Sequence, residues 1–298
     1  MRQCTFAVGI ITYNKKEICL MNHIKYTGKG IGVAILDTGI SSHIDFDSRI
    51  KGFYDFLHGK KQPYDDNGHG THVAGIIGGS GLASQGKHCG IAPECNLISL
   101  KILDNKGNGS MKDVMRAFQW LKTNKLQEDI RIVNISVGTV GKGDKNSSLL
   151  IKGVEELWDE GFVVVTAAGN MGPEPGSVTA PGSSRKVITV GSSDLLEGYG
   201  GISGRGPTKD CICKPDMVAP GSGIISCSSR SRYGYSMKSG TSMSTPKISG
   251  AIALMLEKDP FLTNVEIKML LWESARDLGY DRNLQGWGEL DLEKLVQL

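Results

Sequence analysis

The 298-residue sequence lacks long apolar runs, an excess of charge of one sign and low-complexity segments. No run approaches the roughly 18 consecutive apolar residues needed to cross a bilayer, so no membrane partner is expected. The net charge is only +3, with Lys and Arg mixed among Asp and Glu, which argues against a nucleic-acid partner. No Pro- or Ser-rich linker and no internal repeat divides the chain, which favours one large domain.

The first 23 residues lack the features of a secretion signal. Their short apolar stretch is cut off by the polar residues 14–17 (NKKE), and no small-residue cleavage site follows. We therefore expect a cytoplasmic protein whose seven cysteines are reduced thiols. Cys211 and Cys213, spaced C-x-C without a second pair, are a poor zinc signal. FAVGIITY (6–13) indicates an extra strand, so we expect an N-terminal arm over 1–23 and one domain over 24–298.

Short β-branched runs alternate with amphipathic helical patterns along the chain. The runs are apolar throughout, which is typical of strands buried on both faces of a parallel sheet. The predicted strands cover 32–36, 96–103, 131–137, 162–168 and 186–191, and the clearest predicted helices cover 111–124 and 147–161. The pattern predicts an α/β fold with a doubly wound, mostly parallel sheet flanked by helices in three layers. In such sheets, functional residues gather beyond the carboxyl ends of the strands.

Asp37 is the first of three candidate site residues. It directly follows a predicted buried strand, so its carboxylate is partly desolvated and needs hydrogen-bond partners or a catalytic role. A turn or helix cap formed with Thr38 and Gly39 would satisfy it equally well.

His69 and His72 lie three residues apart in NGHGTHVAGIIGG (67–79), on a predicted helix. Two histidines on one helix could bind a metal, but the third ligand that a zinc site needs is not on that helix. Gly68 and Gly70 flank His69 and leave its ring accessible. His69 is therefore the better candidate for a general base, and His72 for a packing residue.

The segment SGTSMSTPKISG (239–250) holds six hydroxyl side chains. Pro246 cannot donate to the carbonyl four residues earlier, so the helix ladder is open at Ser242. A hydroxyl there would lie at a helix N-terminus, where unpaired N–H groups and the helix dipole favour a developing oxyanion. Ser242 is thus the nucleophile candidate, although an N-cap remains an alternative for the segment taken alone.

Asp, His and Ser in this chain order match the order found in subtilisin, and no G-x-S-x-G occurs. The chain resembles the subtilisin family of serine peptidases (subtilases) from about Ile24 to its C-terminus. The resemblance implies that Asp37 orients the histidine, His69 is the general base and Ser242 the nucleophile, with Asn170 as the side-chain donor of an oxyanion hole. The matching segments are YTGKGIGVAILDTGI (26–40), NGHGTHVAGIIGG (67–79), GIAPECNLISLKIL (90–103), VNISVG (133–138), TAAGNMGPEPG (166–176), KPDMVAPG (214–221) and SGTSMSTPKISG (239–250).

The resemblance also implies a polypeptide substrate bound as an added extended strand. Two backbone segments would flank it, one containing Ser136, Val137 and Gly138, the other Gly107, Asn108 and Gly109. Ala167, Ala168, Gly169, Met171, Thr179 and Ala180 would line the pocket for the residue before the scissile bond. None of these is acidic, so a neutral or hydrophobic residue is expected there. Asp65 and Asp66 could favour a basic residue further upstream, or could form a solvated acidic loop.

Two departures from the family pattern bear on cofactors and processing. Asp45 occupies the place of a family calcium ligand, but the usual calcium loop is replaced by GGSGLASQGKHCG (78–90) with Lys87. A structural calcium is therefore a weak expectation, and catalysis needs no cofactor. The roughly twenty residues before the domain are shorter than the propeptide of many relatives, so folding without a pro-region is expected.

The leading hypothesis is an intracellular serine endopeptidase. It divides into a general protease and a dedicated protease that trims leader peptides from precursors, and the residues do not decide between these. A peptide-binding pseudoprotease and an esterase are the alternatives. Oligomeric state is left open.

Overall fold

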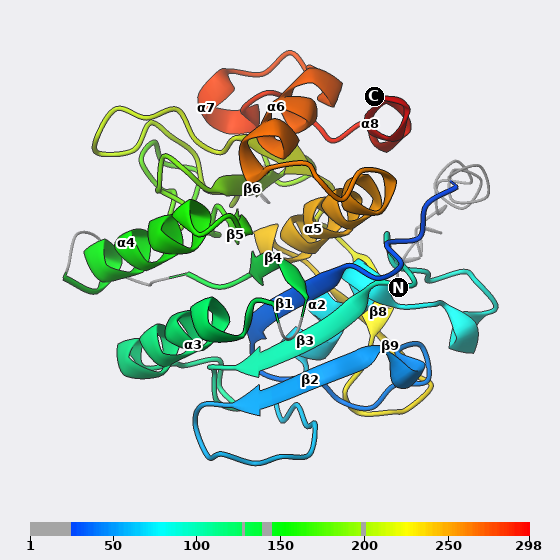
Figure 1. Cartoon of the computed structure of the whole chain (residues 1–298). Coiled ribbons are helices and arrows are strands. Elements are labelled where there is room, and N and C mark those ends of the chain that lie inside the picture. Colours follow the sequence, from blue (N-terminus) through cyan, green and yellow to red (C-terminus); the bar gives the residue numbers. More distant parts are fainter. Residues whose placement is uncertain (1–24, 127–128, 139–144, 198–200) are drawn as a thin grey trace, which may run out of the picture.

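The computed structural model describes residues 25–126, 129–138, 145–197 and 201–298. The predicted arm over 1–23, and with it the strand expected at 6–13, lies outside these residues. Figure 1 shows one sheet crossing the molecule, with helices on both of its faces.

The seven-stranded sheet has the order β2-β3-β1-β4-β5-β6-β7, and all of its neighbouring strands pair in parallel. Its central strands β1 and β5 are buried along their whole length and β4 at all positions but Arg131, because helices cover both faces. The strands are β1 (Gly32–Asp37), β2 (Ile50–Asp55), β3 (Asn96–Lys101), β4 (Ile130–Ile135), β5 (Val163–Ala167), β6 (Ile188–Ser192) and β7 (Met217–Ala219).

Two helix pairs form the outer layers (Figure 1). On one face, α2 (His69–Gly78) packs against α5 (Thr241–Lys258), and on the other, α3 (Met111–Asn124) packs against α4 (Lys145–Asp159). The α5 helix is buried over most of its length, as expected from its run of small and apolar residues. The remaining helices are α6 (Asn264–Ser274), α7 (Arg282–Gln285), α8 (Leu292–Gln297), η1 (Asp47–Arg49) and η2 (Leu82–Ser84).

A separate antiparallel hairpin of β8 (Ile224–Cys227) and β9 (Tyr235–Lys238) covers α2. His72 fixes this contact, because its Nε2 donates to the carbonyl of Ile224 (3.1 Å) and to that of Ser236 (3.0 Å). Burial lowers the pKa of His72 to about 4, so the ring is neutral at physiological pH. The packing role predicted for His72 is what its contacts show.

The predicted doubly wound α/β fold is confirmed. After β1 the chain runs to β2 and β3 on one side of β1, and then crosses to β4 on the other side. The reversal of strand order lies between β1 and β4, and ligands of such sheets bind beyond the strand ends at that point. Asp37 ends β1 and Ser136 follows β4, so both lie at this edge.

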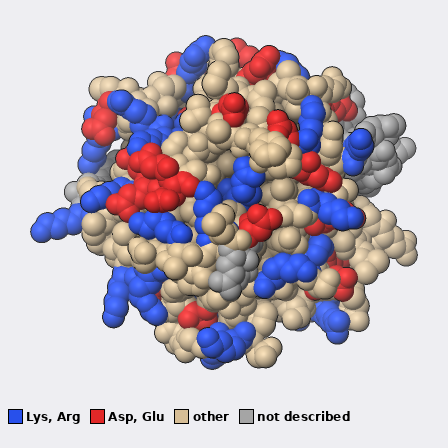
Figure 2. Space-filling model, in the orientation of Figure 1, with Lys and Arg blue, Asp and Glu red and all other residues tan. Residues whose placement is uncertain are grey.

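Figure 2 shows acidic and basic side chains interspersed across the visible face, in keeping with the net charge of +3. Within the described ranges, every helix falls short of the length and apolarity needed to cross a membrane.

Candidate active site

Asp37 and His69 form a direct pair at the carboxyl edge of the sheet. Asp37 is 1% exposed, and its Oδ1 and Oδ2 lie 2.7 and 2.9 Å from Nδ1 of His69. The backbone N–H of Thr38 also donates to Oδ1, at 2.7 Å. A carboxylate only accepts, so Nδ1 carries the proton and Nε2 keeps its lone pair. His69 is thereby held in the tautomer that a general base requires.

Opposing effects set the pKa of His69. Burial lowers it, but the charge and hydrogen bond of Asp37 raise it more, so the pKa lies above its usual value. Lys238, at the end of β9, lowers the pKa through its positive charge, and Asp65 raises it. The β8–β9 hairpin therefore tunes the ring electrostatically.

Replacing Lys238 by glutamine should move the acidic limb of the kcat/KM profile to higher pH. Lys238 disfavours the imidazolium, so without it His69 stays protonated up to a higher pH. If His69 is the general base, activity is lost over the same pH range. The measurement is kcat/KM against pH at low ionic strength, with Lys238→Arg as the matched control that keeps the charge. High salt should screen the lysine and move the wild-type limb in the same direction. A glutamine variant whose limb coincides with that of the arginine variant would refute this tuning.

Asp65 joins the end of β1 to the start of α2 through five hydrogen bonds. Its Oδ1 accepts from the Thr38 hydroxyl (2.8 Å) and the N–H groups of Asn67 (3.1 Å) and Gly68 (2.7 Å). Its Oδ2 accepts from the N–H (2.9 Å) and hydroxyl (2.6 Å) of Thr71. Burial raises the pKa of Asp65, but these donors outweigh it and the pKa lies below its usual value. Asp65 thus ties the strand that carries Asp37 to the helix that carries His69.

The glycines beside His69 allow this close approach. A Cβ at Gly70 would lie 2.2 Å from the carbonyl oxygen of Gly39, so a side chain there would force the helix away from the turn after β1. Gly68 has φ = +95°, a conformation that favours glycine. His69 consequently begins α2 within reach of Asp37.

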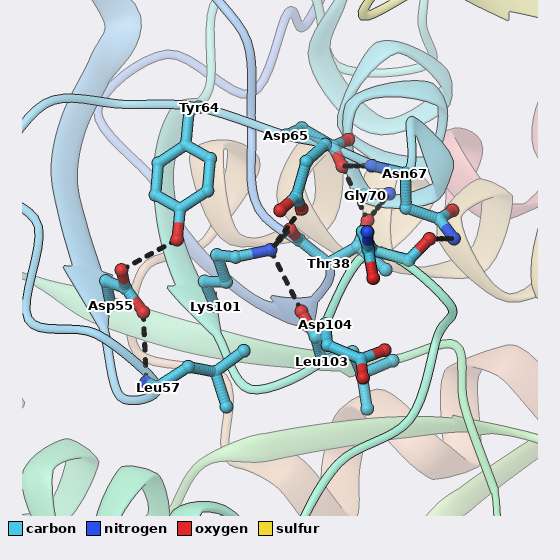
Figure 3. Close-up of polar contacts among 12 residues, drawn as sticks. Thr38, Asp55, Leu57, Tyr64, Asp65, Asn67, Gly70, Lys101, Leu103 and Asp104 are labelled. Carbon is cyan, nitrogen blue, oxygen red and sulfur yellow. Dashed lines mark hydrogen bonds and ion pairs between the residues drawn. The ribbon is translucent and has the colours of Figure 1, made fainter.

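Lys101 is a fully buried cation beside Asp37, because the two residues are register partners on β3 and β1. It points between Thr38 and Leu103 (Figure 3). Its Nζ donates to the carbonyl of Thr38, to that of Leu103 (2.9 Å) and to the carboxylate of Asp66 (2.7 Å). Burying a charge needs such partners, and here they fix the turn after Asp37.

These contacts bear on the expectation that Asp65 and Asp66 select a basic substrate residue. Asp65 is buried and directs both oxygens into the protein, and Asp66 is paired with Lys101. Asp65 therefore neither lies in a solvated acidic loop nor offers its carboxylate to a substrate side chain. The sequence does not predict that Asp65 joins β1 and α2, because its hydrogen-bond donors lie both after β1 and at the start of α2.

Ser242 is the second residue of α5, as the position of Pro246 predicted. Gly240 precedes the helix with φ = +135°, and α5 packs against α2. Among the described residues, the Ser242 hydroxyl donates to the carbonyl of Ser136 (2.7 Å) rather than to His69. Catalytic hydrogen bonds often form fully only with substrate bound, so this contact is compatible with a nucleophilic role.

Asn170 lies against the first turn of the same helix. Its Oδ1 accepts from the N–H (3.0 Å) and hydroxyl (3.2 Å) of Thr241, and the Thr241 hydroxyl accepts from the N–H of Gly169 (3.2 Å). Thr241 therefore fixes the carbonyl end of the Asn170 amide. Asn170 is exposed and follows β5, so the loop after that strand reaches the start of α5.

Three of the expected substrate-binding residues, Gly138, Ala168 and Gly169, meet around Thr179. Its N–H donates to the carbonyl of Ala168 (3.0 Å), and Cβ atoms added at Gly138 and Gly169 would lie 2.6 and 2.4 Å from its hydroxyl. The segments after β4 and β5 thus approach each other at glycines. Ala167 completes the buried wall.

The remaining expected pocket residues lie at the edges of this arrangement. Val137 is half-buried after β4, and Met171 is 54% exposed. Gly107, Asn108 and Gly109 are exposed in the turn after β3. This turn is held near His69 because the side-chain amide of Asn67 donates to the carbonyl of Asn105 (3.0 Å).

Asp45, the expected calcium ligand, is fully buried. Its Oδ1 accepts from the N–H of Ala83 (2.9 Å), its Oδ2 accepts from the hydroxyl of Tyr235 (2.7 Å), and the thiol of Cys227 lies 3.7 Å from Oδ2. Ca²⁺ requires six to eight oxygen ligands. Around the Asp45 carboxylate the side chains are a histidine, a cysteine and a single tyrosine hydroxyl, so these residues do not fit a Ca²⁺ ion.

The chain matches known proteins along most of its length. A family model described as "Subtilase family" matches residues 28–288. Serine protease AprX from Bacillus subtilis (strain 168) is 40% identical, over 94% of this chain and 69% of that protein. Subtilisin Savinase from Lederbergia lenta is 35% identical, over 90% of this chain and 91% of that protein. The solved structure of Sphericase superposes with a TM-score of 0.76 at 29% identity, covering 89% of this chain and 92% of the other.

Proposed function

The chain belongs to the subtilase family of serine proteases, and from that premise we propose that Asp37, His69 and Ser242 form its catalytic triad. The observation that carries the proposal is the Asp37–His69 pair, which leaves Nε2 of His69 basic. The helix α5, which carries Ser242 in its first turn, packs against α2, which begins at His69. As a subtilase, the protein hydrolyses peptide bonds.

The proposed reaction follows from these positions. The Ser242 Oγ turns from the Ser136 carbonyl toward His69, loses its proton to Nε2 and bonds to the substrate carbonyl carbon. His69 then passes the proton to the leaving amine as the C–N bond breaks. Water repeats the sequence to release the acyl group. Asp37 holds the imidazole in place and stabilises the imidazolium.

The start of α5 would stabilise the tetrahedral oxyanion. The N–H of Ser242 lies in the first turn of an 18-residue helix, where N–H groups lack partners within the helix and the dipole is positive. The NH₂ group of Asn170 is the proposed second donor. Its carbonyl is held by Thr241, so this donor is oriented before the substrate arrives.

The substrate is proposed to bind as an extended strand between the segments at 107–109 and 136–138. Its residue before the scissile bond would enter the pocket walled by Ala167, Ala168 and Gly169 and closed by Thr179. The wall is apolar or hydroxylic, which favours a neutral or hydrophobic residue. Whether the chain digests proteins broadly or trims leader peptides from precursors is the finer question.

A fluorophosphonate probe tests the triad directly. The full chain should react, and peptide mapping should place the adduct on Ser242, because the probe bonds only to an activated serine. Absence of any adduct in a folded sample would favour the pseudoprotease alternative. An adduct on another serine would reject the assignment of Ser242.

Cleavage profiling on a peptide library tests the pocket. Most cleavages should follow neutral or hydrophobic residues, and a dominant preference for Arg or Lys would contradict the proposed pocket. Comparing one unstructured protein with a set of defined precursor peptides separates the two protease roles. Rapid degradation of the unstructured protein supports a general protease, and cleavage confined to precursors supports a processing enzyme. The cytoplasmic location stays a prediction.

A further inference from the structure

His43, Asp45 and Cys227 form a buried cluster that takes no part in the proposed chemistry. Their potential ligand atoms all lie within 4.8 Å of one another, and the residues are 3%, 0% and 1% exposed. They come from segments far apart in the sequence. His43 and Asp45 belong to the loop between β1 and β2, and Cys227 ends β8.

The hydrogen bonds of His43 fix which nitrogen can bind a metal. Its Nε2 lies 2.9 Å from the carbonyl of Gly234, which only accepts, so Nε2 carries the proton. Its Nδ1 accepts the N–H of Asp45 at 3.2 Å, so the lone pair is on this atom, and a metal bound there would take the place of that N–H. A backbone carbonyl that holds one ring nitrogen while the other faces a ligand site is the usual environment of a metal-bound histidine.

Asp45 is held in a way that suits a metal ligand. One oxygen accepts from the N–H of Ala83 and the other from the hydroxyl of Tyr235. A carboxylate has about four lone-pair sites, so both oxygens keep capacity to accept. Ligating carboxylates are typically oriented by such outer hydrogen bonds.

Two separations, each to a different oxygen of Asp45, are close to those of tetrahedral coordination. His43 Nδ1 lies 3.8 Å from Asp45 Oδ1, and Cys227 Sγ lies 3.7 Å from Asp45 Oδ2. Ligands at about 2.0–2.3 Å from a tetrahedral Zn²⁺ ion are about 3.3–3.8 Å apart. Small side-chain movements would therefore close the site, and the Tyr235 hydroxyl offers a further oxygen.

We propose that His43, Asp45 and Cys227 bind one structural Zn²⁺ ion. A neutral imidazole, a carboxylate and a thiolate balance the two positive charges of the ion, so the buried complex carries no net charge. Binding releases the thiol proton of Cys227. The ion would join the loop after β1 to the hairpin that carries Lys238 and leads into α5. This role goes beyond proteolysis.

Metal content and the spectrum of the Co²⁺ form test the site. The full chain carrying Ser242→Ala, which prevents self-digestion, is purified after expression with added Zn²⁺ and analysed by mass spectrometry for bound metal. We expect one Zn²⁺ per chain and, after exchange to Co²⁺, a thiolate-to-metal charge-transfer band in the near ultraviolet. Zn²⁺ at about 100 times its Kd should raise Tm by about 5 °C.

Matched cysteine variants assign the site. Cys227→Ser should weaken Zn²⁺ binding at least ~10-fold and abolish the charge-transfer band. Two control variants should keep both the Zn²⁺ affinity and the charge-transfer band. One is Cys95→Ser, which removes another buried cysteine, and the other is the double variant Cys211→Ser/Cys213→Ser, which removes two exposed cysteines. Three results would each overturn the proposal. The chain with all three ligands intact could lack stoichiometric Zn²⁺, it could bind Ca²⁺ in place of Zn²⁺, or the charge-transfer band could survive Cys227→Ser. If Cys227→Ser does not fold, the metal content and the Co²⁺ spectrum of the parent chain still test whether the site binds a metal through a thiolate.

Discussion

Replacing Ser242 by alanine should lower kcat on a peptide substrate by about 10⁶-fold, which is the size of the effect at the equivalent serine of subtilisin itself. The reason is that no acyl-enzyme can form without the Oγ atom. The residual rate should exceed that of the uncatalysed reaction by about 10³–10⁴-fold, because the oxyanion donors and the substrate cleft remain.

Ser244 provides the matched control for this variant. It lies two residues further along α5, and its buried hydroxyl has no hydrogen-bond partner among the described atoms. Ser244→Ala should therefore fold and keep kcat within a few-fold of the wild type. Initial rates on a chromogenic peptide, with circular dichroism to verify folding, measure both variants. If Ser242→Ala retained more than about one per cent of the activity, acyl-enzyme catalysis at this residue would be excluded.

The position of Ser242 at the start of a helix could be predicted from the sequence because it depends on local geometry. Gly240 precedes the helix and Pro246 lies in its second turn. Because proline has no N–H, the carbonyl of Ser242 lacks its helical hydrogen bond, and this follows from the residue types alone. The five longest buried strands were predictable for the same reason, since continuous apolar runs need no knowledge of distant partners. The short strand β7 and the weakly patterned hairpin of β8 and β9 carry no comparable local signal.

Residues whose roles depend on long-range packing could not be predicted. Lys101 ends an otherwise ordinary strand, and only the register of β3 against β1 places its charge beside Asp37. The sequence allows Asp65 to lie in a solvated acidic loop, because its five hydrogen-bond donors are set by the packing of β1 against α2. Cys227 lies 182 residues from Asp45. The family resemblance implies a calcium ligand at Asp45, and nothing in the sequence indicates its sulfur neighbour.

Replacing Asp37 by asparagine should lower kcat by about 10⁴-fold, a size taken from other serine-protease triads. The hydrogen bonds around Asp37 explain why an isosteric change is so costly. The Thr38 N–H donates to Oδ1, so the amide oxygen of asparagine should take that position and place its NH₂ at Oδ2, 2.9 Å from His69 Nδ1. An N–H there favours a lone pair on Nδ1 and the proton on Nε2. His69 then cannot accept the proton of Ser242.

For Asp37→Asn we also expect a pH shift of the acidic limb, in the direction opposite to that expected for Lys238→Gln. The charge of Asp37 raises the pKa of His69, so its loss should lower that pKa and move the acidic limb of the residual kcat/KM profile to lower pH. Asp66→Asn is the matched control, because Asp66 is paired with Lys101 and does not contact the imidazole. A residual activity above one tenth of the wild type, or a limb displaced to higher pH, would show that Asp37 does not govern the tautomer and charge of His69. In that case the Asp37–His69 hydrogen bonds would hold the loop in place without serving proton transfer.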